Sequence, residues 1–435
     1  TLQPTGSSTG TILRNVTIRG SMKGGIFLNI TDSHVEVENV DIRDMPKTFE
    51  AGINIRIPAD GGSVNLVNIY MENITAYQNG GCFFMSIRNA TCNVRNATCK
   101  SSQASVDGGY LSGAVGLSAY FANSTVTMTD TNWYDLDSST VGIVGLRIER
   151  GGSFLLEDSH FENLHAIGLG GGVSATLNGL SGNITATIRS VTFVNCSAIN
   201  GGGIWLKTFP DSNAIATVVD CTFTQNNADS FGGGLCANLA SGSLMVANST
   251  FSNNTAPLFD SSAAYIDFSD SFQSDGLPQI SFYSSHLDNN TAAFKGGGNI
   301  SFAPGQIQKI NGSFVIDNTT LIRMQATSNL NIDGKFFVDG HLEVLVDDVT
   351  LTSSDPITLA TYSSVTGQFA SVTFVDAKGG TCEGKAEYLA TAMQVTMQCP
   401  PPPNTPEVPV GAIVGGVVGG VVFLVLVALL ISMLV

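Results

Sequence analysis

The residues of this chain that most often carry chemistry are its five histidines and eight cysteines. The histidines are His34, His160, His165, His286 and His341. They stand far apart in the sequence, and no cysteine or histidine pair has the CxxC or related spacing with which proteins hold zinc. The sequence therefore predicts neither a metal site nor a cofactor.

Carboxylates are the next candidates, because glycoside hydrolysis needs two of them flanking the scissile bond. Asp347 and Asp348 are adjacent, but neighbouring residues of a strand face opposite sides of a sheet. Serine is abundant, and spacing alone selects no Ser-His-Asp group. No helical pattern follows the glycine runs, so they do not predict a phosphate-binding loop. We therefore assign no catalytic residue.

The cysteines cannot be paired from the sequence alone. They are Cys82, Cys92, Cys99, Cys196, Cys221, Cys236, Cys382 and Cys399. Cys382 and Cys399 lie in a terminal segment and are the best candidates for a disulfide that closes it. Cys92 and Cys99 are either small buried hydrophobic residues or the two ends of a local bridge.

Fourteen Asn-x-Ser/Thr sequons are spread over the chain and are absent from its tail. They begin at Asn15, Asn29, Asn73, Asn89, Asn96, Asn123, Asn183, Asn195, Asn248, Asn253, Asn289, Asn299, Asn311 and Asn318. A chain rich in Asn, Ser and Thr forms many sequons by accident, so each one alone is a weak signal. Their number and distribution favour an N-glycosylated extracellular protein.

The formal net charge is −16, and only 12% of the residues are charged. This balance argues against nucleic acid as a partner, because nucleic-acid binding needs basic patches. With so few charges, Asn, Ser and Thr must supply most of the polar surface. Such a composition is typical of β-corners.

A repeat of about 30 residues must position these groups, since one column of apolar residues covers 303 residues in ten steps. The column comprises Ile18, Ile42, Met71, Cys99, Trp133, Phe161, Phe193, Phe223, Phe251, Leu287 and Leu321. The residues five and seven positions earlier are apolar in nearly every repeat, and the residue between those two is mostly polar. This alternation predicts half-buried β-strands.

A second column, mostly of glycines, keeps the same period. It comprises Gly25, Gly52, Gly81, Gly113, Gly142, Gly172, Gly203, Gly234, Ala264 and Gly298. Strands with glycine corners at this period predict an all-β fold, a parallel β-helix of ten or eleven rungs in which like residues stack. A propeller built from hairpin blades is the alternative architecture.

Two motifs in these columns carry a family resemblance. Phe223–Asn226 and Phe251–Asn254 read FxxN, whereas Gly202–Ile204 and Gly233–Leu235 read GG followed by an aliphatic residue. Over about 300 residues the chain resembles the polymorphic outer-membrane protein repeat. It departs from that repeat in its earliest rungs, which lack Phe. The resemblance implies a right-handed parallel β-helix and a role in adhesion.

The repeats are expected to occupy residues 1–310, with loops near 101–113 and 259–278 as suitable places for a binding site. Residues 311–399 are predicted to be terminal rungs and a β cap that hides the last apolar rung. Residues 400–409 form a Pro-rich linker, which favours polyproline II.

Residues 410–435 carry no charge and are long enough for one transmembrane helix. The prediction is a single-pass protein of the cell membrane with its β-helix outside the cell and the lipid bilayer as a partner. No Lys or Arg follows the apolar run, so a lipid-anchored cell-surface protein is the alternative. Gly411, Gly415 and Gly419 have the GxxxG spacing of paired membrane helices.

These patterns together predict a surface protein that binds an unknown extracellular protein or glycan, in adhesion or recognition, and that is not an enzyme. One alternative is a pectin-lyase-like enzyme that acts on polysaccharides. That family's GDD, GHG and RxK motifs are missing, and Gly340-His341 is not followed by glycine. The other alternative is a passive structural stalk or coat.

Overall fold

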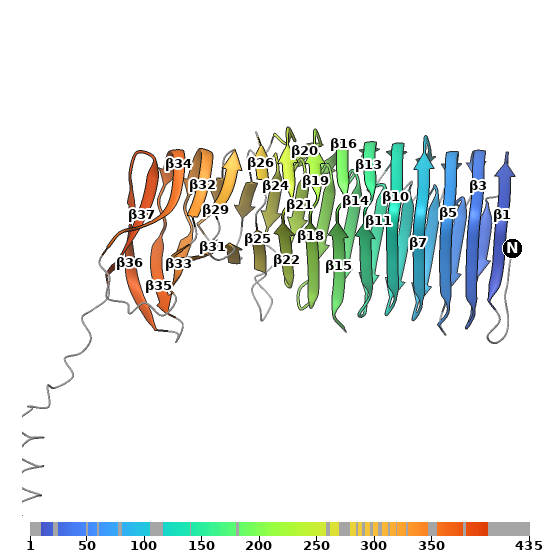
Figure 1. Ribbon diagram of the computed structural model, residues 1–435, viewed down its shortest axis with the longest axis horizontal. Coiled ribbons are helices and arrows are strands. Elements are labelled where there is room, and N and C mark those ends of the chain that lie inside the picture. The colour runs from blue at the N-terminus through green and yellow to red at the C-terminus, as the bar shows by residue number, and fades with distance from the viewer. Residues whose placement is uncertain are drawn as a thin grey trace, which may run out of the picture.

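A computed structural model shows strands stacked along one axis, with the N-terminus at one end of the stack (Figure 1). It describes residues 10–20, 25–48, 51–58, 61–76, 81–104, 116–139, 141–179, 182–257, 262–268, 279–283, 286–288, 292–295, 299–302, 307–311, 314–318, 320–327, 329–346, 355–376 and 380–398. These residues contain strands and no helix, and they form a parallel β-solenoid of about nine turns. The all-β parallel coil predicted from the repeat is thereby confirmed.

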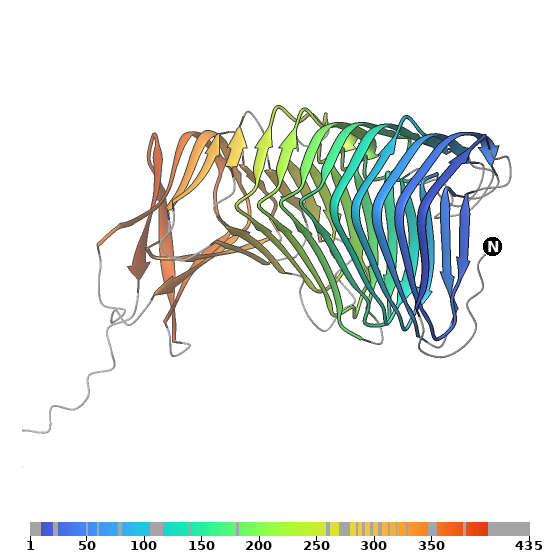
Figure 2. The same cartoon turned by 45° about the vertical axis from the view of Figure 1, so that its right-hand side comes forward.

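Each turn, or rung, contributes a strand to three faces, which we call A, B and C, and successive rungs lie side by side (Figure 2). Face A begins each rung after the glycine corner. Its strands are β2 (Ile26–Asn29), β4 (Ile53–Ile57), β6 (Phe83–Arg88), β9 (Leu117–Ala122), β11 (Val144–Glu149), β14 (Val173–Asn178), β17 (Ile204–Thr208), β21 (Leu235–Asn238), β24 (Ala264–Asp267), β27 (Ala292–Lys295) and β30 (Phe314–Ile316).

In the first five rungs a single long strand runs from face B around a corner into face C. These strands are β1 (Thr11–Arg19), β3 (His34–Thr48), β5 (Ser63–Ala76), β7 (Thr91–Lys100) and β10 (Thr125–Ser138). Face B continues with β12 (Ser153–Glu157), β15 (Ile184–Arg189), β18 (Ala214–Val219), β22 (Ser243–Ala247), β25 (Gln279–Tyr283), β28 (Asn299–Phe302), β31 (Leu321–Gln325), β33 (His341–Val346) and β35 (Ser371–Asp376).

Face C continues with shorter strands of its own. They are β13 (His160–Ala166), β16 (Thr192–Asn200), β19 (Thr222–Thr224), β23 (Thr250–Ser252), β26 (His286–Asp288) and β29 (Ile307–Asn311), followed by β32 (Asn329–Val338) and β34 (Ile357–Gly367). Two short strands, β8 (Gln103–Ala104) and β20 (Asn227–Phe231), extend face C past its far corner.

One residue in the left-handed conformation turns each rung from face B to face C. The residues are Asn15, Asn39, Asn68, Asn96, Asp130, Asp158, Ser190, Asp220 and Asn248, with φ between 48° and 57°. Asn and Asp dominate because they tolerate this conformation better than other non-glycine residues. Asparagines of adjacent rungs also bond to each other: Asn68 Nδ2 donates to Asn39 Oδ1 at 2.9 Å, and Asn96 Nδ2 donates to Asn68 Oδ1 at 2.8 Å.

The apolar column predicted from the repeat is confirmed from Ile18 to Leu287, because each member pairs with the next in parallel register. The prediction that Leu321 is the last member of this column is wrong. Leu287 pairs with Ile310, only 23 residues on, and Leu321 lies on face B opposite Asn299. The rung has shortened, so a fixed period of 30 overshoots it.

The glycine column is confirmed directly before face A at Gly25, Gly52, Gly172, Gly203 and Gly234, whose backbones bond from rung to rung. It slips by one residue elsewhere, because the residues that precede the paired strands are Cys82, Ile143 and Ala263 instead of Gly81, Gly142 and Ala264. Gly113 and Gly298 lie outside the described residues.

The parallel pairing continues through β35, after which the direction changes. Strands β36 (Thr381–Tyr388) and β37 (Ala392–Gln398) pair antiparallel to each other, and they pair antiparallel to β35 and β34. Strand β24 lies inside the stretch predicted as a loop at 259–278, since residues 264–267 continue face A.

The predicted linker 400–409 and apolar segment 410–435 lie outside the described residues. Within the described ranges, no helix has the length and hydropathy to span a membrane.

Candidate binding surface

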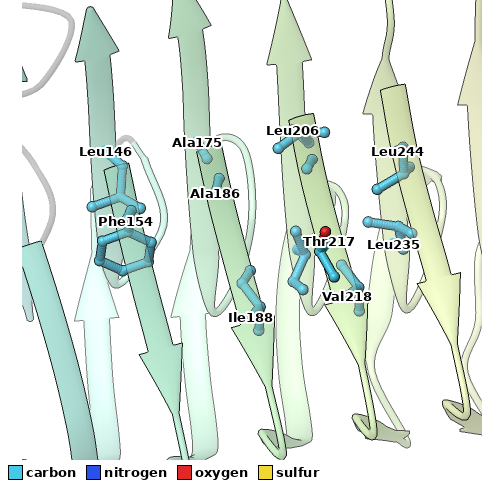
Figure 3. Close-up of a pocket in the computed structure, with 12 residues that line it drawn as sticks. Leu146, Phe154, Ala175, Ala186, Ile188, Leu206, Thr217, Val218, Leu235 and Leu244 are labelled. Atoms are coloured by element: carbon cyan, nitrogen blue, oxygen red, sulfur yellow. The ribbon is translucent and has the colours of Figure 1, made fainter. Parts of the chain in front are cut away.

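The interior of the coil is filled by side chains. Figure 3 shows inward side chains from neighbouring rungs around a cavity of about 10 Å³. Its lining is apolar except for Thr217 and includes Leu146, Phe154, Leu206 and Leu244. Such a void is about the size of one water molecule and offers fewer polar partners than a buried water needs, so it holds no ligand. Among the residues that the structure describes, we therefore look for a binding site on the outer surface.

Histidines bridge neighbouring rungs on that surface. Nδ1 of His34 lies 2.7 Å from Ser63 Oγ, and Nδ1 of His165 lies 2.8 Å from Ser197 Oγ. Among the residues that the structure describes, no three potential metal ligands approach one another. Asp347 and Asp348 lie outside those residues, as does the side chain of His286.

The disulfide in the coil joins Cys82 to Cys99, with Cα atoms 6.3 Å apart. Of the two alternatives for Cys92 and Cys99, the bridge between them is wrong, since Cys92 is a free thiol; the other alternative, a small buried residue, is confirmed for Cys92. Cys92 lies on face B and Cys99 on face C, whereas Cys82 lies at the corner that returns the chain to face A. Cys382 is disulfide-bonded, whereas Cys399 lies outside the described residues, so the pairing of these two cysteines stays a prediction.

The free thiols form a second group, all of them buried. Burial disfavours the thiolate and raises the pKa of Cys92 to about 12. The pKa of Cys221 is likewise raised to about 12, mainly by burial. Burial also raises the pKa values of Cys196 and Cys236. These cysteines act as core residues and not as nucleophiles.

Ten of the sequon asparagines are exposed. They are Asn15, Asn73, Asn89, Asn96, Asn123, Asn183, Asn195, Asn248, Asn253 and Asn318. Asn29 is half-buried, while Asn289 and the side chains of Asn299 and Asn311 lie outside the described residues. The exposed amides are accessible to a glycosyltransferase, and glycan attachment stays a prediction.

The corners explain why sequons are so frequent. Asn89, Asn123 and Asn248 each adopt a left-handed conformation. In each case the next residue is buried, and a threonine then begins the following strand, at Thr91, Thr125 and Thr250. The Asn-x-Thr sequence of a sequon therefore arises from a corner Asn, an inward residue and an outward Thr. Glycans at these three asparagines would therefore stand at corners of the coil.

The outer surface of face B holds a groove of about 340 Å³ across β3, β5, β7 and β10, which we call the face B groove. It is lined by Glu36, Asn65, Leu66, Val67, Asn93, Val94, Arg95, Thr127 and Thr129. Its volume falls within the range of small-molecule sites, at roughly 300–1,000 Å³. The sequence did not predict it, because outward strand positions show only polar alternation.

The groove is lined by amide, hydroxyl and charged groups. Asn93 Nδ2 donates to Asn65 Oδ1 at 2.9 Å, which orients both amides along the rungs. Glu36 is held by Arg14, with 3.8 Å between Oε2 and Nη2. Arg95 is exposed and makes no ion pair with any described residue. The groove thus offers donors, acceptors and one uncompensated positive charge.

Comparison with models of protein families gives no match to this sequence, and comparison with curated proteins gives none either. The parallel coil is therefore established by the structure, whereas the likeness to the polymorphic outer-membrane protein repeat is carried by the FxxN and GG motifs alone.

Proposed function

We propose that this chain is an N-glycosylated cell-surface β-helix, of the right-handed type found in polymorphic outer-membrane proteins, that binds an extracellular partner in adhesion or recognition. The observation that carries the proposal is the face B groove. Its mixture of amide, hydroxyl and guanidinium groups suits a ligand rich in hydroxyl groups, such as a glycan, because each of these groups can bond to a hydroxyl.

The surface location is supported by covalent chemistry. A disulfide within the coil and a bonded Cys382 are typical of proteins outside the reducing cytosol. Exposed sequons at the corners are compatible with N-glycans, because the corner amides lie outside the core.

We further propose that residues 410–435 anchor the coil in the membrane through one helix and that residues 400–409 act as a spacer. The apolar composition of the tail supports the first role and its prolines support the second. Strands β36 and β37 are proposed to cap the solenoid, because their antiparallel pairing ends the succession of parallel rungs.

The full chain, produced in a eukaryotic secretory host, should bind to cells or to members of a glycan panel. Arg95→Gln and Thr129→Ala should each weaken that binding about tenfold, since each removes a hydrogen-bonding group from the groove. Thr187→Ala is the matched control, because Thr187 is an outward residue of the same face on β15. If Arg95→Gln and Thr129→Ala bind as tightly as Thr187→Ala, the face B groove is not the binding site.

The absence of binding to any cell or glycan would favour a passive stalk or coat. Depolymerisation of a polysaccharide by the same preparation would favour the enzyme instead.

A further inference from the structure

Face A carries a row of stacked arginines and aromatic rings on its outer surface, which we call the face A strip. It crosses five consecutive rungs, β2, β4, β6, β9 and β11, and so extends for about 19 Å along the coil axis. Its members are Phe27, Arg56, Phe84, Arg88, Tyr120 and Arg147.

The first half of the strip is an arginine between two phenylalanines. The Arg56 guanidinium carbon lies 5.4 Å from the ring centre of Phe27 and 5.8 Å from that of Phe84. These rings belong to the rungs before and after that of Arg56. Ring contacts on both sides favour one orientation of the guanidinium, whose N–H edge stays available for an oxyanion.

The second half reverses this order, with a ring between two arginines. The guanidinium carbons of Arg88 and Arg147 lie 5.8 Å and 6.0 Å from the ring centre of Tyr120. Tyr120 donates its hydroxyl hydrogen to Glu149 at 2.9 Å, and Arg147 pairs with the same carboxylate at 2.7 Å. Glu149 therefore holds Tyr120 and Arg147 in place.

Arg56 and Arg88 remain exposed, and neither forms an ion pair with a described residue. Beside Arg56, Asn54 is 1% exposed and both its Oδ1 and Nδ2 lack a partner. A single hydroxyl or water could bond to both atoms, because a hydroxyl both donates and accepts. The strip thus has unused guanidinium groups next to unused capacity for hydroxyl hydrogen bonds.

From this geometry we infer that the face A strip binds a linear anionic polysaccharide, one that carries carboxylate or sulfate groups at intervals. The strip is locally basic on a chain whose net charge is −16, so charge selects an anionic partner. Arg56 and Arg88, on two neighbouring rungs, suit oxyanions repeated along an extended chain, since guanidinium binds carboxylate and sulfate in bidentate fashion. The orphaned amide favours a sugar over an acidic peptide.

This site lies on a different face from the groove. Its failure is therefore distinguishable from failure of the proposed function, which the face B variants test.

The test uses the full chain in detergent micelles, with heparin, polygalacturonate, neutral dextran and polyglutamate as probes. Heparin, polygalacturonate or both should bind, and dextran should not. Arg56→Gln and Arg88→Gln should each weaken binding about tenfold, and the double variant more than either. Arg19→Gln is the matched control, because Arg19 is exposed, forms no ion pair with a described residue and lies on face C, outside both candidate sites. It should stay within about twofold of the unaltered chain.

Three results would overturn the inference. Equal losses in Arg19→Gln and Arg56→Gln would show attraction by net charge alone. Polyglutamate binding as tightly as the polysaccharides would make the strip a peptide site. Failure of both anionic polysaccharides to bind the unaltered chain would remove the site altogether. Arg56→Lys adds a check on geometry, because it keeps the charge but loses the bidentate contact. Its affinity should fall between that of the unaltered chain and that of Arg56→Gln.

Discussion

Gly203 leaves the space that the ring of Phe223 fills in the next rung. A Cβ atom on Gly203 would lie only 2.7 Å from Cδ1 of Phe223. The same relationship holds in the neighbouring rungs, at 2.6 Å for Gly172 with Phe193 and for Gly234 with Phe251. The GG and FxxN motifs are therefore two sides of one contact, repeated along the coil. This contact explains why the two columns keep one period.

Gly203→Ala should destabilise the chain by about 1–3 kcal/mol, because the added methyl overpacks the ring stack. The methyl would also meet the carbonyl oxygen of Gly234 at 2.6 Å. Thr176→Ala, on the outer surface of β14, is the control and should stay within about 0.5 kcal/mol. Equal free energies of unfolding for both variants in urea would contradict the contact.

Phe223→Ala should cost about 3–5 kcal/mol, since it opens a cavity in the middle of a stack. Phe223 is fully buried, and its ring centre lies 5.0 Å from that of Phe193 and 4.5 Å from that of Phe251. Ile18→Ala should cost less, because Ile18 belongs to the first rung of the same column and is only partly buried. Thermal unfolding of the two variants measures the difference, and a larger loss at Ile18 would be inconsistent with a central core.

Asn226→Ala should destabilise the chain by about 1–3 kcal/mol, because it leaves buried backbone groups without partners. Asn226 Oδ1 accepts from Cys196 N–H at 2.9 Å, and its Nδ2 donates to the Phe193 carbonyl at 3.1 Å. Asn238→Ala removes a half-buried amide from the outer surface of β21 and should be nearly neutral. If the urea midpoints of the two variants coincide, the buried hydrogen bonds of Asn226 contribute nothing to the free energy of unfolding.

Sequence reasoning located the stacked column because its members face the core in every rung, where only apolar residues are tolerated. It misplaced Leu321, since the rungs shorten after Leu287 and a constant period cannot follow that change. The corner residues beside the FxxN motifs are Gln225 and Asn253, one position before the motif asparagines. Those asparagines, Asn226 and Asn254, are buried in the core.

The two candidate sites could not be predicted, because both consist of outward side chains. Arg56 and Phe84 are 28 positions apart and meet only when their rungs stack. No motif distinguishes such pairs from ordinary surface residues. The partner of Cys99 was missed for a related reason, since Cys82 reaches it only when the coil closes.

Stability should fall as the pH rises above about 9, owing to the buried thiols. The pKa of Cys92 is raised from 9.0 to about 12 in the fold, so the folded state keeps its proton where the unfolded state has lost it. This contribution is fully present below pH 9.0 and is lost progressively towards pH 12. Each buried thiol should lower the free energy of unfolding by about 1.4 kcal/mol per pH unit.

Cys92→Ala should show a shallower loss over this interval than the unaltered chain, by about that amount. Urea unfolding at several pH values measures it. Parallel pH profiles for the two proteins would mean that the Cys92 thiol does not titrate differently in the folded and unfolded states.

The most direct test of the stacked coil is a set of distances along one column of face C. Thr98, Asn132, His160, Thr192, Thr222 and Thr250 occupy the same outward position in six successive rungs. Spin labels placed in pairs along this column, measured by electron resonance, should show distances that grow by about 4.8 Å per rung. The labels at Thr98 and Thr250 are separated by five rung-to-rung steps and should therefore lie about 24 Å apart. Distances that do not increase with the number of intervening rungs would contradict the parallel solenoid.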